Sequence, residues 1–226
     1  MRVAILQSNY FPWRGYFSII NSVDLFVFHD DLQYTKNDWR NRNRFIRANE
    51  NPTWLSIPCG TSEKRLICEV KLPNTNWEKE HFQKINDWYS GKINIQKYRP
   101  LLEEIYLRNK FTTLSDFNQF WIKFIAQVEF QSKTDFLDSR TLNLTKTKSS
   151  RVIEILTEVG ASSYLSGPSG RNYLNEDDFR SKGIELEYAD YAKLPELNKI
   201  CQRQGEFSIL HDLLEHPNGT SLLGEL

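Results

Sequence analysis

Two short, uninterrupted apolar runs near the start of the chain constrain its fold more than any other feature. Residues 3–6 and 25–28 contain only apolar side chains. They lack the alternation of a strand with one wet face, so each run predicts a strand covered on both faces. Residues 15–22 lie between them and carry apolar side chains at helical spacing. Strand, helix and strand make a βαβ unit, whose two strands are parallel.

Later in the chain, short apolar runs again alternate with helical patterns. The expected strands are residues 136–137, 164–166 and 184–188. The expected helices begin at Ser149 or Ser150 and at Asn175, and they end at Gly160 and Gly183. Glycine suits the left-handed cap at such an end. The alternation predicts an α/β fold with a mostly parallel, Rossmann-like sheet.

Two other segments depart from this alternation. Residues 76–130 carry aromatic and aliphatic side chains at three- and four-residue steps, which predicts two or three helices. We therefore expect a single α/β domain over residues 1–226 with a helical insertion at residues 76–132. Residues 54–57 and 66–72 have the composition of strands, and we expect them to pair antiparallel beside the main sheet.

The charge balance and the cysteines exclude several classes of protein. Lys plus Arg and Asp plus Glu number 29 each, so no overall field draws the chain to nucleic acid or to an anionic membrane. Cys59, Cys68 and Cys201 have no C-x-x-C spacing, which argues against a disulfide framework or a zinc knuckle. The apolar run after Arg2 is too short for a signal peptide or a membrane span. We expect a cytoplasmic protein, and a homo-oligomer is compatible with the sequence.

The loop after the first predicted strand is the leading candidate for a ligand site. Gln7 and Asn9 contribute amides there, and Tyr10, Trp13 and Tyr16 contribute rings. Ligands of parallel sheets bind where the strands end, and pockets combine apolar walls with a few polar groups. The alternative is that the rings plug the end of the sheet while the amides satisfy turn backbone.

Two carboxylates follow the second apolar run. Asp30 and Asp31 come directly after His29, at the carboxyl end of a predicted strand. Oxygen ligands of this kind hold Mg²⁺ or Mn²⁺ against the phosphates of a nucleotide, and a carboxylate also accepts a proton as a general base. Adjacent aspartates are equally ordinary in turns. We take Asp30 and Asp31 as the catalytic candidates.

A local cluster of cations lies between residues 36 and 47 in a chain with no net charge. Its members are Lys36, Arg40, Arg42, Arg44 and Arg47. In a strand the three central arginines would share one face, and Asn41 and Asn43 the other. A guanidinium pairs bidentately with phosphate or carboxylate, so the cluster predicts an anion site. The alternative is a solvated edge strand.

Two turns in the later half of the chain are candidates for the other wall of the same pocket. Lys148, Ser149 and Ser150 stand where a helix begins, and its free N–H groups suit a phosphate, although Ser-Ser is also a routine N-cap. Residues 166–173 form a glycine-rich turn in which Arg171 is available for an anion. The turn lacks the Gly-Lys-Ser ending of a P-loop, so that motif is excluded.

The sequence resembles the WbqC-like family over nearly its whole length. The resemblance rests on residues 3–17, 30–34, 39–43 and 164–167. Many members of the family carry His-Gln-Pro where this chain has Leu6, Gln7 and Ser8. The resemblance implies a role in bacterial cell-surface polysaccharide (O-antigen, lipopolysaccharide) biosynthesis, often beside amino-sugar enzymes.

A more distant resemblance concerns the reaction. Residues 11–16 are similar to the start of adenylyl-transferring α/β folds, and residues 169–174 are similar to a turn of pantoate–β-alanine ligase. This resemblance implies an adenylyltransferase-like sheet and ATP with Mg²⁺ as cofactor. Trp13 and Tyr16 occupy the positions of the usual histidines, so the imidazole pair that steadies a triphosphate is missing.

These features together predict a transferase or amide ligase that adds an acyl or aminoacyl group to a nucleotide-linked amino sugar or a similar small anionic substrate. The alternatives are a metal-dependent glycosyltransferase and a non-catalytic partner in a polysaccharide-assembly complex, and the partner predicts a flat, filled surface after the first strand. The predicted binding residues are Gln7, Asn9, Tyr10, Trp13, Tyr16, Gln33, Tyr34, Lys36, Trp39, Arg40, Asn41, Arg42, Asn43, Arg44, Lys148, Ser149, Ser150, Ser166, Gly167, Arg171 and Tyr173.

Overall fold

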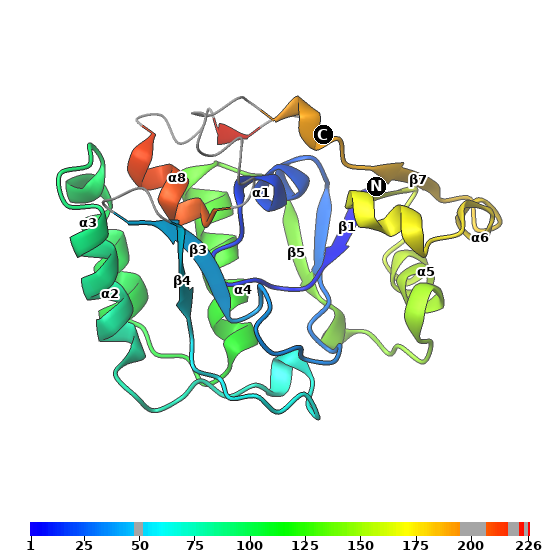
Figure 1. Cartoon of the computed structure of the whole chain (residues 1–226). Helices are drawn as coiled ribbons and strands as arrows, with labels where there is room; N and C mark the ends of the chain where they lie inside the picture. The colour runs from blue at the N-terminus through cyan, green and yellow to red at the C-terminus, as the bar shows by residue number, and fades with distance from the viewer. Residues whose placement is uncertain (48–51, 195–206, 217–221, 224–225) are drawn as a thin grey trace.

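Five strands form a parallel sheet at the centre of the protein. The computed structural model describes residues 1–47, 52–194, 207–216, 222–223 and 226. In spatial order the strands are β5 (Asp135–Asp138), β2 (Leu25–Phe28), β1 (Arg2–Leu6), β6 (Ser163–Ser166) and β7 (Glu185–Tyr188) (Figure 1). Every neighbouring pair is parallel. The chain builds outward from β1 to one edge and then crosses to the other side, as in a doubly wound sheet. The predicted α/β class with a parallel sheet is confirmed.

The central strand β1 is covered on both faces, which explains its unbroken apolar sequence. Val3 and Ile5 pack with Ile155 and Phe179 on one side of the sheet. Ala4 packs on the other side, in the cluster that contains much of the first helix. Both faces exclude water, so β1 has no polar side to alternate with its apolar one.

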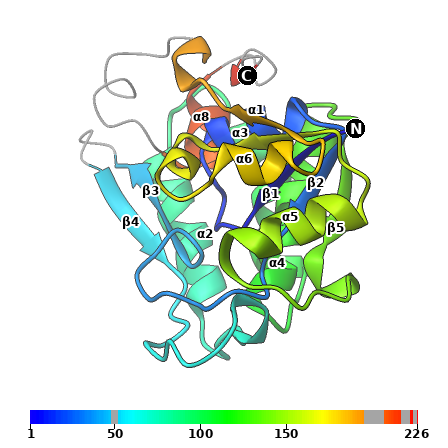
Figure 2. The ribbon, with the colours of Figure 1, turned by 90° about the vertical axis from the view of Figure 1, so that its right-hand side faces the viewer.

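Helices cover the two faces of the sheet. The first face carries α1 (Arg14–Asn21) and α4 (Leu114–Phe124), and the second carries α5 (Lys148–Glu158) and α6 (Glu176–Arg180) (Figures 1 and 2). The expected helix signals are present: the Asn175 side chain accepts from the Asp177 N–H at 3.1 Å, and Gly160 and Gly183 both have φ of +69°. The start at Asn175 and the end at Gly160 are confirmed, whereas α5 begins at Lys148, just before the expected Ser149 or Ser150, and α6 ends at Arg180, before Gly183.

The predicted helical stretch between residues 76 and 130 contains three α-helices. They are α2 (Trp77–Trp88), α3 (Ile95–Glu103) and α4, and the wider turns Glu104–Arg108 and Ile125–Glu129 continue α3 and α4. A further helix, α8 (Ile209–Glu215), packs beside α2 and α3 (Figure 1). Short 3-10 helices lie at Ile67–Glu69, Ser139–Thr141, Pro168–Asn172 and Tyr191–Lys193.

A separate antiparallel hairpin is formed by β3 (Arg42–Ile46) and β4 (Pro52–Ser56). The expected pairing of residues 54–57 with residues 66–72 is therefore wrong. Residues 66–72 contain a 3-10 turn instead, because Ile67 and Val70, three residues apart, both point into the core. That spacing belongs to a helical turn, not to a strand. The start of β3 also leaves Arg40 outside the strand alternation that would have aligned it with Arg42 and Arg44.

Two further expectations concern the cysteines and membrane-spanning segments. Cys59 and Cys68 are free thiols, and Cys201 lies outside the described residues. Across the described helices, no stretch is both long and apolar enough to cross a membrane.

Candidate functional site

The loop after β1 and the segment before β3 lie against each other at the carboxyl edge of the sheet. The Tyr10 N–H donates to the Trp39 carbonyl at 2.9 Å. The Asn43 side-chain amide donates to the carbonyls of Tyr10 and Phe11 at 3.1 and 2.8 Å, which holds Phe11 at a left-handed φ of +41°. Both N–H bonds of the Asn43 amide are thus used to shape the loop, while Asn41 binds the Ile57 carbonyl in the same way.

Arg40 is the cation at the centre of this assembly. Its two terminal nitrogens donate to the side-chain oxygens of Asn9, at 2.6 Å, and of Gln7. A guanidinium only donates, so each amide must turn its oxygen toward Arg40 and its NH₂ group away. Neither NH₂ group has a hydrogen-bond partner within the described parts of the chain. The cluster therefore presents N–H donors and a positive charge, which suits an anionic ligand rich in acceptors.

The charge of Arg40 is only partly balanced by the protein. Its side chain is 15% exposed, and its closest carboxylate oxygen, on Asp38, is 3.6 Å away. Asp38 itself accepts from Thr35 and from the Trp39 N–H. The Arg40 Nε is buried without a partner in the described structure. Burial lowers the pKa of Arg40, because it disfavours an uncompensated cation, yet arginine stays protonated in proteins.

A small cavity of about 90 Å³ opens beside Arg40, lined by Asn9, Pro12, Trp13, Trp39 and Asn43. The Trp13 ring lies so close to the first turn of α1 that a Cβ on Gly15 would approach it to 2.3 Å. The other edge of Trp13 meets Tyr191, with ring centroids 4.7 Å apart. The cavity thus has two indole walls and an amide beside the cation, a lining typical of small-molecule sites.

Asp30 lies beneath the loop and organises it. Its carboxylate has no solvent exposure and accepts from the Ser8 N–H at 2.7 Å, from Ser115 at 2.5 Å and from Gln119 at 3.0 Å. Gln119 also donates to Asp138 at the end of β5. Asp30 therefore fixes the position of the β1 loop relative to α4.

Asp31 belongs to a second cluster, with His29, Ser139 and Arg151. Arg151 in the first turn of α5 donates from Nε to His29 at 3.2 Å and from a terminal nitrogen to Asp31. The His29 ring is 3.7 Å from the Asp31 carboxylate, and burial lowers the pKa of His29. His29 is neutral and accepts through Nε2, so this cluster joins the end of β2 to the start of α5.

Neither aspartate is arranged to hold a metal ion. Each of the four carboxylate oxygens of Asp30 and Asp31 accepts a hydrogen bond or an ion pair from a protein donor. Within the described residues, no group of three or more His, Cys, Asp or Glu side chains is placed to bind a metal. Asp30 and Asp31, the candidates for holding Mg²⁺ or Mn²⁺ against the phosphates of a nucleotide, do not fit a metal ion as they stand.

The remaining predicted residues of the N-terminal region fall into buried and exposed groups. Tyr10 lies in the core, where its hydroxyl contacts His81 at 2.8 Å and Tyr106 at 2.6 Å. Tyr16 is buried and donates to the Gln7 carbonyl at 3.0 Å. Tyr34 is buried beneath Arg65. The exposed members are Gln33 and Lys36.

The predicted residues of the later half lie at the ends of β6 and the start of α5. Arg171 stacks on Tyr188 at 4.1 Å, and Tyr173 is exposed. The others are Lys148, Ser149 and Ser150 in the first turn of α5, and Ser166 and Gly167 at the end of β6. In the described structure no hydrogen bond or ion pair connects them to Arg40. The two halves approach each other where Trp13 contacts Tyr191, next to Gly167, and where Arg151 binds His29 and Asp31.

Sequence reasoning missed the residues that reach the site from α4 and β4. Ser115 and Gln119 bind Asp30, and Asn118 donates to the Arg40 carbonyl at 2.9 Å. Trp54 on β4 packs against Trp39, with ring centroids 5.2 Å apart. These three α4 residues are polar, yet they share the buried face of the helix with its aromatic side chains. Polar residues on a face expected to be apolar were the available signal for partners in the site.

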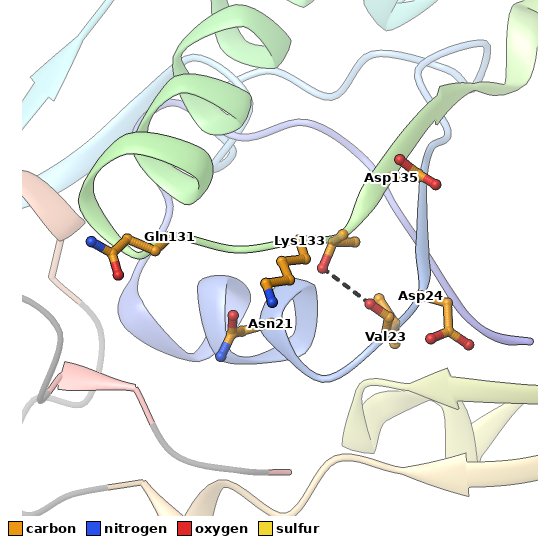
Figure 3. Close-up of a pocket in the computed structure, with 7 residues that line it drawn as sticks. Asn21, Val23, Asp24, Gln131, Lys133 and Asp135 are labelled. Atoms are coloured by element: carbon orange, nitrogen blue, oxygen red, sulfur yellow. Dashed lines mark hydrogen bonds between the residues drawn. The ribbon is translucent and has the colours of Figure 1, made fainter.

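A larger, open hollow of about 470 Å³ lies at the opposite, amino-terminal edge of the sheet. Figure 3 shows its side chains between the end of α1 and the start of β5. Thr134 there donates to the Val23 carbonyl at 3.0 Å, and Asp24 accepts from the Arg2 N–H. These contacts hold strand ends together, so the donor-rich cavity at the carboxyl edge remains the candidate site.

The fold and this site define a doubly wound α/β protein with an aromatic cavity, next to the Arg40 cluster, where its central strand ends. Its sequence matches the model of the WbqC-like protein family over residues 7–210, and the chain belongs to that family. It is 35% identical over 192 residues to Uncharacterized protein Rv1507c of Mycobacterium tuberculosis (strain ATCC 25618 / H37Rv), covering 84% of this chain and 82% of that protein. No solved structure matches the chain.

Proposed function

We propose that this chain is an enzyme of bacterial cell-surface polysaccharide biosynthesis that adds an acyl or aminoacyl group to the amine of a nucleotide-linked amino sugar. The observation that carries the proposal is the donor cluster of Arg40, Gln7 and Asn9 at the carboxyl end of β1. The phosphates of a nucleotide-linked sugar are anionic and their oxygens accept hydrogen bonds, so they match this cluster in charge and in hydrogen bonding.

The cavity beside Arg40 supports a small ligand rather than a protein partner. A non-catalytic partner predicts a filled surface after the first strand, whereas Trp13 and Trp39 enclose about 90 Å³ there. Indole faces pack against the apolar face of a sugar ring, and the free amide of Asn9 donates to a hydroxyl. The phosphate then lies at Arg40 and the sugar between the two indoles.

The reaction joins the neutral amine of the sugar to an activated acyl carbon. The C–N bond forms, the bond to the leaving group breaks, and the amine loses one proton. We assign that proton to Asp31, whose side chain is 15% exposed and which gives up its hydrogen bond from Ser139 to accept it, and give Asp30 a positioning role because it is fully buried and bonded to three protein donors. A metal-dependent glycosyltransferase is less well supported, because no group of three or more His, Cys, Asp or Glu side chains in the described residues is placed to hold a metal.

The test is a mass-spectrometric assay of the purified chain with UDP- and dTDP-4-amino sugars, each supplied with amino acids plus ATP or with acyl-coenzyme A donors. The expected result is an amide product for one donor and acceptor pair, lost in Arg40→Met. The matched control is Arg108→Met, which removes an arginine that is 66% exposed and pairs with Glu104. No amide with any pair, together with no nucleotide binding, would sink the proposal.

A further inference from the structure

The β3–β4 hairpin and Trp39, which precedes it, bring together tryptophans and arginines that the donor cluster does not include. We call Trp39, Arg42, Arg44 and Trp54 the ledge. The Arg42 guanidinium lies 4.2 Å from the centre of the Trp54 ring. Arg44 lies 5.7 Å from the Trp39 ring and 5.9 Å from the Trp54 ring. Trp54 is 41% exposed, so part of its ring is accessible to a ligand.

Arg42 forms no close ion pair in the described part of the chain, and its longer-range attraction is the weakest of the influences that lower the pKa of Asp38, after Arg40, Thr35 and the Trp39 N–H. No carboxylate lies within 4.0 Å of its guanidinium, none of its nitrogens has a hydrogen-bond partner there, and its Nε is buried. A guanidinium that packs over an indole ring can still donate from its terminal nitrogens to a ligand. The stack therefore positions Arg42 without neutralising it.

The ledge begins where the cavity ends. Trp39 lines the cavity and also contacts Trp54, with ring centroids 5.2 Å apart. One water molecule needs on the order of 10–15 Å³ of cavity volume. A cavity of about 90 Å³ therefore holds a sugar ring at most. A nucleotide-linked sugar in it must extend beyond the cavity, and the ledge is the aromatic and cationic surface at that point.

We propose that the ledge binds the nucleotide half of the ligand, with the nucleobase packed on Trp54 and a phosphate oxygen on Arg42. The inference rests on the proposed function for the identity of that ligand. This arrangement gives the bound nucleotide sugar one orientation. The sugar lies in the cavity, the sugar-side phosphate lies at Arg40, and the nucleoside points outward along β4. Trp54 and Arg42 then determine whether the chain accepts a nucleotide sugar or a simple sugar phosphate.

The test measures binding by calorimetry of two probes, UDP or dTDP and N-acetylglucosamine 1-phosphate, to the full chain. Trp54→Ala and Arg42→Gln are expected to weaken nucleotide binding about tenfold each, because a base stacked on an aromatic ring contributes substantially, and to leave the sugar phosphate within about twofold of wild type. The matched control is Phe120→Ala, which removes another exposed ring, 44% exposed, on α4. It should change neither affinity.

Several results would overturn the proposal that the nucleotide binds on the ledge. Equal weakening of both probes places the nucleotide elsewhere, and so does no effect of either variant. Absence of nucleotide binding by the wild type also overturns it. A change of oligomeric state in Trp54→Ala, measured by sedimentation, with nucleotide affinity intact would show an interface between copies instead. Nucleotide binding through the ledge without any amide product would instead overturn the reaction proposed above, so the two failures are distinguishable.

Discussion

Arg40 and Arg151 lie at the same edge of the sheet, yet their surroundings differ. Arg151 binds the carboxylate of Asp31 and the ring of His29, so its charge is matched by an anion. Arg40 binds the neutral amides of Gln7 and Asn9 and is 3.6 Å from its closest carboxylate oxygen. The first arrangement ties β2 to α5, whereas the second keeps a positive charge available.

This difference indicates that Arg151 serves stability and that Arg40 serves binding. A largely buried ion pair leaves an uncompensated charge when one partner is removed. Removal of Arg40 leaves two neutral amides that return to water or to each other, and the nearby Asp38 is partly exposed and keeps its bonds from Thr35 and the Trp39 N–H. The two sites should therefore respond in opposite ways to the same substitution.

The largest expected effect comes from breaking the Arg151 cluster. Arg151→Met removes the cation from Asp31, and we expect unfolding free energy to fall by roughly 3 kcal/mol. Urea unfolding followed by far-ultraviolet circular dichroism measures this loss. The control Arg180→Met removes the exposed pair with Asp177 and should change stability by less than about 0.5 kcal/mol. Equal losses in the two variants would contradict the assignment.

The second effect tests the wall of the binding cavity. Gly15→Ala places a Cβ about 2.3 Å from the Trp13 ring, so the indole must move, at a cost of roughly 2 kcal/mol. A change in tryptophan fluorescence and a loss of ligand affinity should accompany it. Gly167→Ala is the matched control, because its nearest neighbour would be the Tyr191 hydroxyl at 3.7 Å. If both alanine variants behave alike, Trp13 is not held where we place it.

The third effect is on the binding arginine itself. Arg40→Met should cost only about 1 kcal/mol of unfolding free energy, because its hydrogen bonds run to neutral groups, while nucleotide binding falls at least tenfold. Side-by-side urea titration and calorimetry of Arg40→Met and Arg151→Met check the contrast. A stability loss as large as that of Arg151→Met, with ligand affinity retained, would reverse the roles we give the two arginines.

The smallest effect concerns pH and the histidine of the Arg151 cluster. Burial lowers the pKa of His29 in the folded chain, so below about pH 6.5 the unfolded chain binds a proton that the folded chain does not. The stability provided by neutral His29 is therefore present above that pH and lost as the pH falls. His29→Gln should make the decline between pH 7 and pH 5 shallower than in the wild type, although His81 and His211, whose pKa values burial also lowers, still contribute. An unchanged slope would rule out His29 as a contributor.

The elements that sequence predicted well are those whose burial is uniform. Residues 3–6 and 25–28 are covered on both faces, and such strands show a continuous apolar run. The hairpin was predicted less well. Residues 66–72 contain apolar side chains at a spacing that fits a helical turn as well as a strand, and only contacts distant in sequence decide between them.

The sequence shows the residue types of the candidate site, but it does not show how the fold divides them into separate clusters. The amides, rings and arginines are visible in the sequence, yet the separation of Arg40 from Arg42 and Arg44 depends on where β3 begins. Asp30 and Asp31 are adjacent in sequence but belong to different clusters, because Ser115 and Gln119 reach one and Arg151 reaches the other. Such partners leave no local pattern.

The position of the Trp13 ring against Gly15 has a consequence for how this binding surface evolves. In many doubly wound proteins the main-chain amides of the first helix recognise the ligand, and main-chain recognition cannot be altered without remodelling the fold. Here an indole covers that turn, and recognition passes to the side chains of Gln7, Asn9 and Arg40. A single codon change can therefore retune the ligand preference of a homologue while the scaffold stays intact.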